Sequence, residues 1–223
     1  MSNPIKPTIK TEIWPILLVL LASISSFYFY ANFPEQVPIH WNYAGEVDNW
    51  GSRQVGAFLF PGIMIGTYLL FLFLPFADPR RERYNQFRKV YHVFKTIIIL
   101  FMVAIYFISS LNTLGYNVSV NKLMPLLVGL LFIIIGNYMA KIKPNWFMGI
   151  RTPWTMSSEE NWTKTHRVGG KIFIFGGILM AITGFLPVEF RLPVFIATII
   201  IILFGTVGYS LGLYLSKNKK IKK

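Results

Sequence analysis

The sequence of 223 residues contains no cysteine, only three histidines and little charge. Without cysteine the chain can form no disulfide, thiolate nucleophile or cysteine metal site. The three histidines are too few and too scattered to indicate a multi-histidine metal centre. We therefore expect no metal or cofactor site from the composition. Enzymes that depend on a cysteine nucleophile or on a cysteine metal site are excluded.

Apolar residues, by contrast, are abundant. Hydrophobic residues make up 54% of the chain, charged residues 14%, and the mean hydropathy is +0.51. These values lie outside the range of ordinary soluble proteins. Six apolar runs each approach the roughly 20 residues that cross a bilayer: Ile13–Ala31, Val55–Phe76, Val93–Leu111, Leu123–Ala140, Val168–Pro187 and Leu192–Leu215. We therefore predict an all-α integral membrane protein with six transmembrane helices.

The basic residues indicate how these helices are oriented. The formal net charge is +13, and 19 of the 22 lysines and arginines fall on one side of the predicted spans. Only Arg53, Lys122 and Arg191 fall on the other side. Because cytoplasmic loops are rich in lysine and arginine, both termini should be cytoplasmic. We expect the basic loops and tail to contact anionic lipids rather than nucleic acid.

The N-terminus resembles a signal sequence, with a basic flank and an apolar core. The apolar run is long, and no small-x-small cleavage site follows it. We expect an uncleaved signal anchor in a multi-pass protein of the cell membrane.

The predicted extracellular loop, residues 32–54, contains a hairpin pattern. Val37, Ile39 and Trp41 alternate with other residues, and turn formers occupy 42–45. A small hairpin-like cap over the bundle should follow. The loop supplies the candidates for ligand sensing: His40, Trp41, Asn42, Gly45 and Asp48. Together with Glu46, the polar members could hold a cation, but a single histidine is a weak metal signal. The alternative is that His40 and Asn42 tie the hairpin to the span ends.

A second polar segment, the predicted cytoplasmic loop 141–171, interrupts the apolar chain. Pro153 should keep Thr152 extended and interrupt the helix. Ser157 and Glu160 have the spacing of a capping box, which predicts a helix that begins near Ser158. Trp162 and His166 lie four residues apart and should share one face of that helix.

Several interpretations of this loop remain open. Arg151 could pair with a cytoplasmic partner, hold the loop against the bundle or contact lipid phosphates. Trp154 and Trp162 could dock a partner, although interfacial anchoring is the more frequent role of tryptophan. His166 could pair with Glu159 or Glu160, or be an ordinary histidine on a polar face.

The spans themselves offer weaker signals. Two pairs of glycines four residues apart, at 62 and 66 and at 208 and 212, predict close helix packing. Asn137, Thr183 and Thr206 are candidates for hydrogen bonds between helices. Lys95 is near enough to the cytoplasmic end of its span to snorkel out. The absence of a buried ionisable relay disfavours an ion-coupled transporter.

Two motifs resemble a known family. Residues 149–155, Gly-Ile-Arg-Thr-Pro-Trp-Thr, together with Trp162 and the preceding pair Gly136 and Asn137, resemble the signature of the SdpI family of bacterial toxin-immunity membrane proteins. The pattern Pro-x-His-Trp-Asn-x-x-Gly at 38–45 resembles an uncharacterised N-terminal membrane domain that is often fused to it. The resemblance covers spans one, two and four to six, and only the hydrophobicity of span three matches.

The resemblance implies a six-span protein that protects its host against a secreted killing peptide. It also implies a receptor role, in which the occupied protein recruits a cytoplasmic transcriptional repressor to the membrane. It transfers no catalytic residue, so no enzyme is expected. The signalling candidates are Asn137, Gly149, Arg151, Thr152, Pro153, Trp154 and Trp162. Residues 1–90 should form a two-helix unit and residues 91–223 an SdpI-like four-helix unit.

Two other functions compete with immunity. A small transporter or exporter of an amphipathic compound would give resistance to more than one peptide. A membrane-embedded hydrolase that uses His40 or His166 has no supporting triad, metal-binding helix motif or carboxylate pair. We rank immunity first, transport second and hydrolysis third.

Overall fold

A computed structural model describes residues 3–221 as a helical bundle with one small hairpin. In the first half of the chain, a long helix leads into two strands, a π-helical turn and two further helices. The elements are α1 (Ile9–Asn32), β1 (Gln36–Trp41), β2 (Val47–Ser52), the turn Val55–Leu59, α2 (Phe60–Ala77), a 3-10 turn at Arg81–Arg83 and α3 (Tyr84–Thr113).

The second half contains three long helices and one short one. They are α4 (Val120–Met139), α5 (Pro153–Ser157), α6 (Glu159–Thr183) and α7 (Val188–Ile221). The last helix continues beyond the predicted sixth span, so part of the basic tail is helical. Lys222 and Lys223, which were also assigned to that tail, lie outside the described residues.

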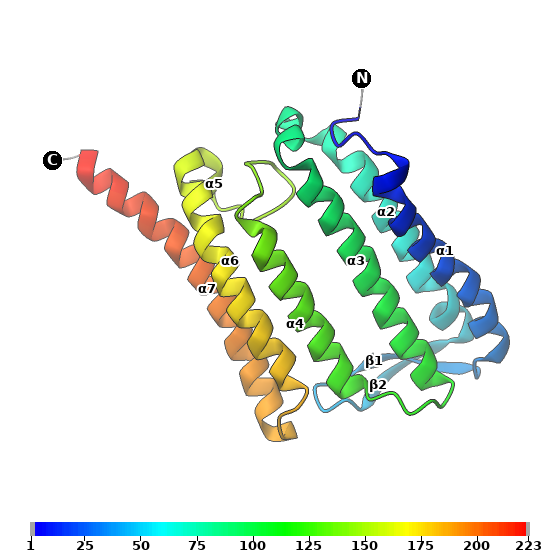
Figure 1. The fold of residues 1–223 in the computed structure, drawn as a ribbon. Helices are drawn as coiled ribbons and strands as arrows, with labels where there is room; N and C mark the ends of the chain where they lie inside the picture. Colours follow the sequence, from blue (N-terminus) through cyan, green and yellow to red (C-terminus); the bar gives the residue numbers. More distant parts are fainter. Residues whose placement is uncertain (1–2, 222–223) are drawn as a thin grey trace.

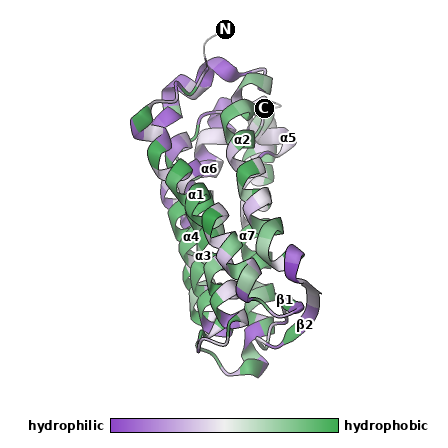
Figure 2. Cartoon of the chain, turned by 90° about the vertical axis from the view of Figure 1, so that its right-hand side faces the viewer, coloured by the Kyte–Doolittle hydropathy of each residue, from purple (hydrophilic) through white to green (hydrophobic). Residues whose placement is uncertain are grey.

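The long helices run side by side along one axis (Figure 1). The N-terminus and the C-terminal end of α7 lie at one end of the bundle, which we call the terminal end. The strands β1 and β2 lie at the opposite end, which we call the hairpin end. Figure 2 shows hydrophobic residues along the length of the helices and hydrophilic ones gathered toward the ends. This pattern is typical of a membrane-spanning bundle.

Within residues 3–221, five helices are long and apolar enough to cross a membrane. They are Ile9–Asn32, Val55–Ala77, Arg81–Thr113, Val120–Met139 and Val188–Lys217, which correspond to predicted spans one to four and six. The chain is therefore a multi-pass membrane protein. The predicted fifth span, 168–187, overlaps α6, which begins with a polar segment and contains four buried glycines. That span, and with it the count of six and the orientation, stays a prediction.

Glycines allow α4 and α6 to pack closely. These are not the glycines at 62, 66, 208 and 212 for which the sequence pattern predicted close packing. A methyl group added to Gly136 would lie 2.5 Å from the carbonyl oxygen of Gly170. Gly129 and Gly177 face each other in the same way, seven residues further along each of the two antiparallel helices. A side chain at any of these positions would force the helices apart, as expected for small residues at membrane helix contacts.

The expectations for the other span residues were wrong. Among the described residues, no atom outside the adjoining turns of the same helix lies within 4 Å of a methyl group added at Gly62, Gly66, Gly208 or Gly212. Thr183 and Thr206 donate to carbonyls of their own helices instead of bridging to neighbours. A spacing of four residues therefore shows that two small residues share a helix face, but not whether that face packs against another helix.

Two apolar cores hold the helices of the bundle together. One lies toward the hairpin end and includes Phe29, Met64 and Tyr106. The other lies toward the terminal end, where Tyr91 and Trp162 come from distant parts of the chain. This second core joins α3 to the loop before α6. The predicted division at residue 90 falls inside α3 and stays a prediction.

Candidate functional site

The hairpin forms as its alternating pattern predicts. Strands β1 and β2 pair antiparallel, with Val37 opposite Gly51 and Trp41 opposite Val47. The turn between them is built by Asn42, whose Oδ1 accepts from the amides of Ala44 and Glu46. Such an Asx turn satisfies backbone donors that the strands leave unpaired.

The two most polar sensing candidates meet across the hairpin. The Nδ1 atom of His40 on β1 lies 2.5 Å from Oδ1 of Asp48 on β2, and both side chains are largely exposed. The predicted tie from His40 to a span end is therefore wrong, because its partner lies on the neighbouring strand. Asn42 likewise bonds within its own turn. Within residues 3–221 no three His, Asp or Glu side chains come close enough to hold a metal ion.

The hairpin is attached to the bundle through its turn. Gly45 has φ +87° and lies against the side chain of Asn121 at the start of α4, where an added methyl group would clash. Nη1 of Arg191, near the start of α7, donates to the carbonyl of Ala44 at 3.2 Å. Glycine is needed here both for the positive φ and for the close contact.

A cavity of about 490 Å³ lies between the hairpin and the bundle. Four of the five sensing candidates line it, namely His40, Trp41, Asn42 and Gly45. The opposite walls come from α3, α4, α6 and α7 and are mostly apolar. Its size falls in the range of small-molecule sites, about 300–1,000 Å³. The cavity can take an apolar group while the hairpin supplies polar contacts.

At the terminal end, His166 organises the loop that contains the signature motif. It is fully buried; its Nε2 accepts the amide of Ile150 at 3.0 Å, and its Nδ1 lies 2.8 Å from the carbonyl of Trp162. These partners require the proton on Nδ1. His166 precedes the predicted span, and burial lowers its pKa to about 4. The polar-face role and the pairing with Glu159 or Glu160 are thus contradicted.

Trp162 stacks on this histidine. Their ring centroids are 4.0 Å apart with an interplanar angle of 18°, so they do share one helix face. Only 1% of Trp162 is exposed, and its Nε1 donates to the carbonyl of Ile142 at 2.9 Å. The interfacial-anchor role of Trp162 is therefore wrong. Gly149, at φ +106°, faces His166 Nε2 so closely that no side chain would fit.

The middle of the signature motif bonds to α7. Thr152 is extended, as predicted, and its hydroxyl lies 2.6 Å from that of Ser210. Asn161 donates to the Ser210 carbonyl at 2.9 Å and accepts from Thr165. Pro153 begins α5 instead of lying in a non-helical segment, because proline suits the first turn of a helix. The next helix, α6, is capped by Ser158 rather than by Ser157.

Several signalling candidates keep exposed surface at this end, among them Arg151, Trp154 and Asn137. Arg151 is exposed and donates to the carbonyl of Trp146 within the loop. Trp154 is half-buried beside Tyr214, with ring centroids 6.3 Å apart. Asn137 is exposed on α4 rather than placed between helices. Trp154 and Tyr214 line a second cavity of about 320 Å³, which has Glu160, Lys164 and Lys217 among its other walls.

Asp78 connects the two halves of the protein at the terminal end. It is 2% exposed, and its Oδ2 accepts from the Tyr84 hydroxyl and the Trp146 amide, each at 2.9 Å. Arg80 reaches the carbonyl of Met156, and Arg83 pairs with Glu159. These contacts fix the signature loop against the start of α3.

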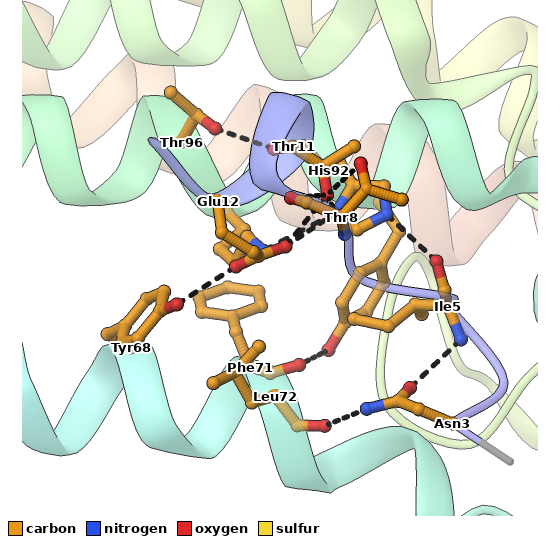
Figure 3. Close-up of polar contacts among 12 residues, drawn as sticks. Asn3, Ile5, Thr8, Thr11, Glu12, Tyr68, Phe71, Leu72, His92 and Thr96 are labelled. Atoms are coloured by element: carbon orange, nitrogen blue, oxygen red, sulfur yellow. Dashed lines mark hydrogen bonds and ion pairs between the residues drawn. The ribbon is translucent and has the colours of Figure 1, made fainter. Parts of the chain in front are cut away.

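A buried charge cluster lies between α1, α2 and α3. Lys95 on α3 is completely buried, and its Nζ lies 2.5 Å from both carboxylate oxygens of Glu12 on α1. The Tyr68 hydroxyl donates to the same carboxylate at 3.0 Å, and His92 approaches it from α3 (Figure 3). The expectation that Lys95 snorkels out is wrong, because a carboxylate is within reach inside the bundle.

Sequence reasoning thus found the residues of the hairpin but missed their partners. Arg191 and the apolar walls of the cavity carry no local motif. Asp78 and Glu12 stand at the ends of predicted spans, where a carboxylate gives no signal of burial.

Comparison with known proteins identifies two segments. Residues 141–211 match the SdpI/YfhL protein family, and residues 17–65 match a domain of unknown function, DUF1648. Over 194 residues the chain is 27% identical to the immunity protein SdpI of Bacillus subtilis (strain 168), covering 87% of this chain and 91% of the relative. No solved structure matches. The resemblance to the SdpI family is confirmed, and the chain is a multi-pass bacterial membrane protein.

Proposed function

We propose that this SdpI-like chain is an immunity protein of the cell membrane that protects its host against a secreted killing peptide. The proposal places the hairpin end outside, where such a peptide arrives. The charge distribution supports this orientation, because 19 of the 22 basic residues would then face the cytoplasm. The likeness to a named immunity protein over most of both chains supports the role.

One observation supports the cavity beneath the hairpin as the site where the peptide binds. The segment that matches DUF1648 supplies His40, Trp41 and Asn42 to the cavity wall, and the segment that matches SdpI/YfhL supplies Met180 and Arg191 opposite them. A ligand in this cavity would contact both segments at once. The joint lining gives a physical reason for the two segments to function together.

The terminal end would then carry the signal inward. In the proposed receptor role, the exposed Arg151 and the half-buried Trp154 meet a cytoplasmic transcriptional repressor. The conformation of the loop is maintained by Gly149, Thr152, Pro153 and Trp162. The bonds of this loop to α7 support a mechanical link, because α7 also borders the hairpin cavity. Basic side chains around the loop would contact anionic lipids.

Transport of an amphipathic compound is the second candidate. The buried pair of Glu12 and Lys95 favours it, since ionisable groups inside a membrane bundle often belong to transport pathways. This pair lies toward the terminal end, whereas the larger cavity lies at the hairpin end. Immunity remains the function that the geometry supports better.

The test uses a bacterium that is sensitive to a killing peptide of the SdpI-associated type. Survival and membrane potential are measured across a dilution series of that peptide, with and without the protein, and again with an unrelated pore former. Immunoblotting of membranes controls for protein abundance. We expect survival and membrane potential to be preserved against the killing peptide alone.

The other outcomes separate the two candidates. Protection against both agents, together with outward movement of a fluorescent amphipathic dye, would favour transport. A protein that is present in the membrane and protects against neither agent would contradict the immunity role.

A further inference from the structure

The cavity beneath the hairpin has one cation and no anion in its walls. Its floor is apolar, with contributions from Met124, Val128 and Phe195. No aspartate or glutamate is among the described residues that line it. His40, the other basic side chain of the wall, has a carboxylate partner in Asp48. Arg191 therefore dominates the charge of the site.

Arg191 is held in place by backbone carbonyls rather than by an acid. Its Nε donates to the carbonyl of Leu186 at 3.0 Å, and its Nη1 donates to that of Ala44 at 3.2 Å. None of the ion pairs among residues 3–221 involves it. A guanidinium group has five N–H donors, so further donors remain for a ligand. A carboxylate is the acceptor that fits this fork best.

The size of the cavity limits what can enter. A volume of about 490 Å³ holds a group the size of a drug molecule, not a folded peptide. A polypeptide can place such a group here most simply by inserting one end of its chain. The C-terminus brings a carboxylate together with its last side chains, which matches one cation above an apolar floor.

We propose that this cavity binds the C-terminal end of the killing peptide, with the terminal carboxylate on Arg191 and apolar side chains against α4 and α7. The proposal rests on the immunity function argued above and adds the chemistry by which the peptide is recognised. The hairpin covers the bound end, and Asn42 and Trp41 contribute polar and aromatic contacts along its wall.

The role of the carboxylate is tested by a double-mutant cycle, which combines a change in the peptide with a change in the protein. The killing peptide is prepared with a free C-terminal carboxylate and as the C-terminal amide. Binding of both forms is measured by fluorescence anisotropy to the full chain in phosphatidylcholine nanodiscs, with empty nanodiscs as the baseline. Amidation should weaken binding to the wild type about tenfold or more, as for a charge-assisted hydrogen bond. With Arg191→Gln, the two forms should bind within about twofold of each other, because the guanidinium group that pairs with the terminal carboxylate has been removed.

Control variants separate charge from folding. Arg53→Gln removes the other arginine near the hairpin, which donates to the Pro34 carbonyl and does not line the cavity. It should keep the wild-type response to amidation. Arg191→Lys should keep part of that response, because the charge remains although the fork is lost.

The apolar floor is tested by filling it. Val128→Phe adds a ring on the cavity wall, while Leu130→Phe adds one on the exposed face of the same helix. The first variant should weaken binding of both peptide forms about tenfold, and the second should leave binding within about twofold, as burial of apolar area predicts. Thermal unfolding of both variants checks that each is folded.

The outcomes distinguish this inference from the proposed function. Equal binding of the two peptide forms to the wild type, with protection of cells intact, would overturn the cavity assignment and leave immunity standing. Protection unchanged by Val128→Phe, with a phospholipid retained by the wild type and lost from that variant, would make the cavity a lipid site and also overturn it. Absence of both binding and protection would overturn both proposals.

Discussion

Nζ of Lys95 lies 2.5 Å from both carboxylate oxygens of Glu12, a residue 83 positions earlier in the chain. The pair joins α1 to α3 inside the bundle, and Tyr68 on α2 donates to the same carboxylate. All three helices of the first half therefore meet at one charge pair. Together with the buried apolar residues of α1, such as Val19 and Phe29, this pair holds α1 against α2 and α3.

Removal of one member of this pair should be strongly destabilising. Lys95→Met leaves Glu12 buried without its counter-ion, which costs about 3–5 kcal/mol in soluble proteins, whereas replacing both members is often neutral. We expect a large fall in the unfolding temperature in detergent for Lys95→Met, and substantial recovery in the double variant with Glu12→Gln. Tryptophan fluorescence during heating measures both.

The control for the charge pair lies on the surface. Lys164 and Glu160 form an exposed pair one turn apart on α6. Lys164→Met should change the unfolding temperature little, since exposed pairs contribute little stability. If the double variant of the buried pair unfolds as early as Lys95→Met, the pairing is not the cause of the loss.

The glycine contact between α4 and α6 gives a second prediction. Gly136→Ala introduces a methyl group 2.5 Å from the Gly170 carbonyl, so the helices must separate. We expect a loss of about 1–3 kcal/mol, as for an overpacked core. Gly66→Ala, where the space around the position is open, should be neutral or stabilising. Similar unfolding temperatures for the two variants would show that the close approach does not limit stability.

His166 predicts a pH dependence of stability. Its pKa is about 4 in the folded protein, against about 6.5 when unfolded. Between these values the unfolded chain binds the extra proton, so the stability contributed by neutral His166 is present above pH 6.5 and is lost as the pH falls toward 4. We expect a loss of about 2 kcal/mol between pH 7.5 and pH 5.

The measurement is the unfolding temperature at the two pH values, for the wild type and for His166→Gln. The variant is less stable at neutral pH, because the Ile150 amide loses its imidazole acceptor. Its decline between pH 7.5 and pH 5 should nevertheless be smaller than that of the wild type. Equal declines would assign the pH dependence to other groups.

The hairpin pair predicts an effect on protection. His40→Ala leaves Asp48 without its partner on β1, which should loosen the wall of the cavity. We expect the protective dose to shift about fivefold, the factor that corresponds to one hydrogen bond of ~1 kcal/mol. Gln36→Ala, at the far end of β1, serves as the control. An unaltered dose curve for His40→Ala, at normal abundance, would restrict His40 to a structural role.

The exposed arginine of the signature loop predicts a separation of two functions. Arg151→Ala should keep protein abundance and protection but lose the induction of a reporter gene controlled by the repressor. Arg167→Ala removes an exposed arginine of α6 outside the motif and should keep induction. A normal reporter response in Arg151→Ala cells would remove Arg151 from the signalling proposal.

Local patterns predicted much of this fold. The hairpin at 36–52 follows from strand alternation and turn formers that are neighbours in sequence. The shared face of Trp162 and His166 follows from helical spacing. Both involve interactions within a few residues, where the geometry is set by the backbone.

Long-range contacts could not be predicted in this way. The partners of Lys95 and Arg191 come from other helices, and no period or spacing connects them. The wrong glycines were selected because i, i+4 spacing does not tell which face meets a neighbour. Trp162 was assigned to the interface because a tryptophan at a span end is frequently found there, whereas its indole donates to a buried carbonyl.

The central claim is that the killing peptide meets the protein at the hairpin end. Cross-linking in cells tests it most directly, with p-benzoylphenylalanine in place of Tyr43, an exposed aromatic residue of the cavity wall, or of Trp146, an exposed one in the loop at the terminal end. After illumination with labelled peptide, we expect a covalent adduct from position 43 and none from position 146. An adduct from position 146 alone, or equal adducts from both, would contradict the claim.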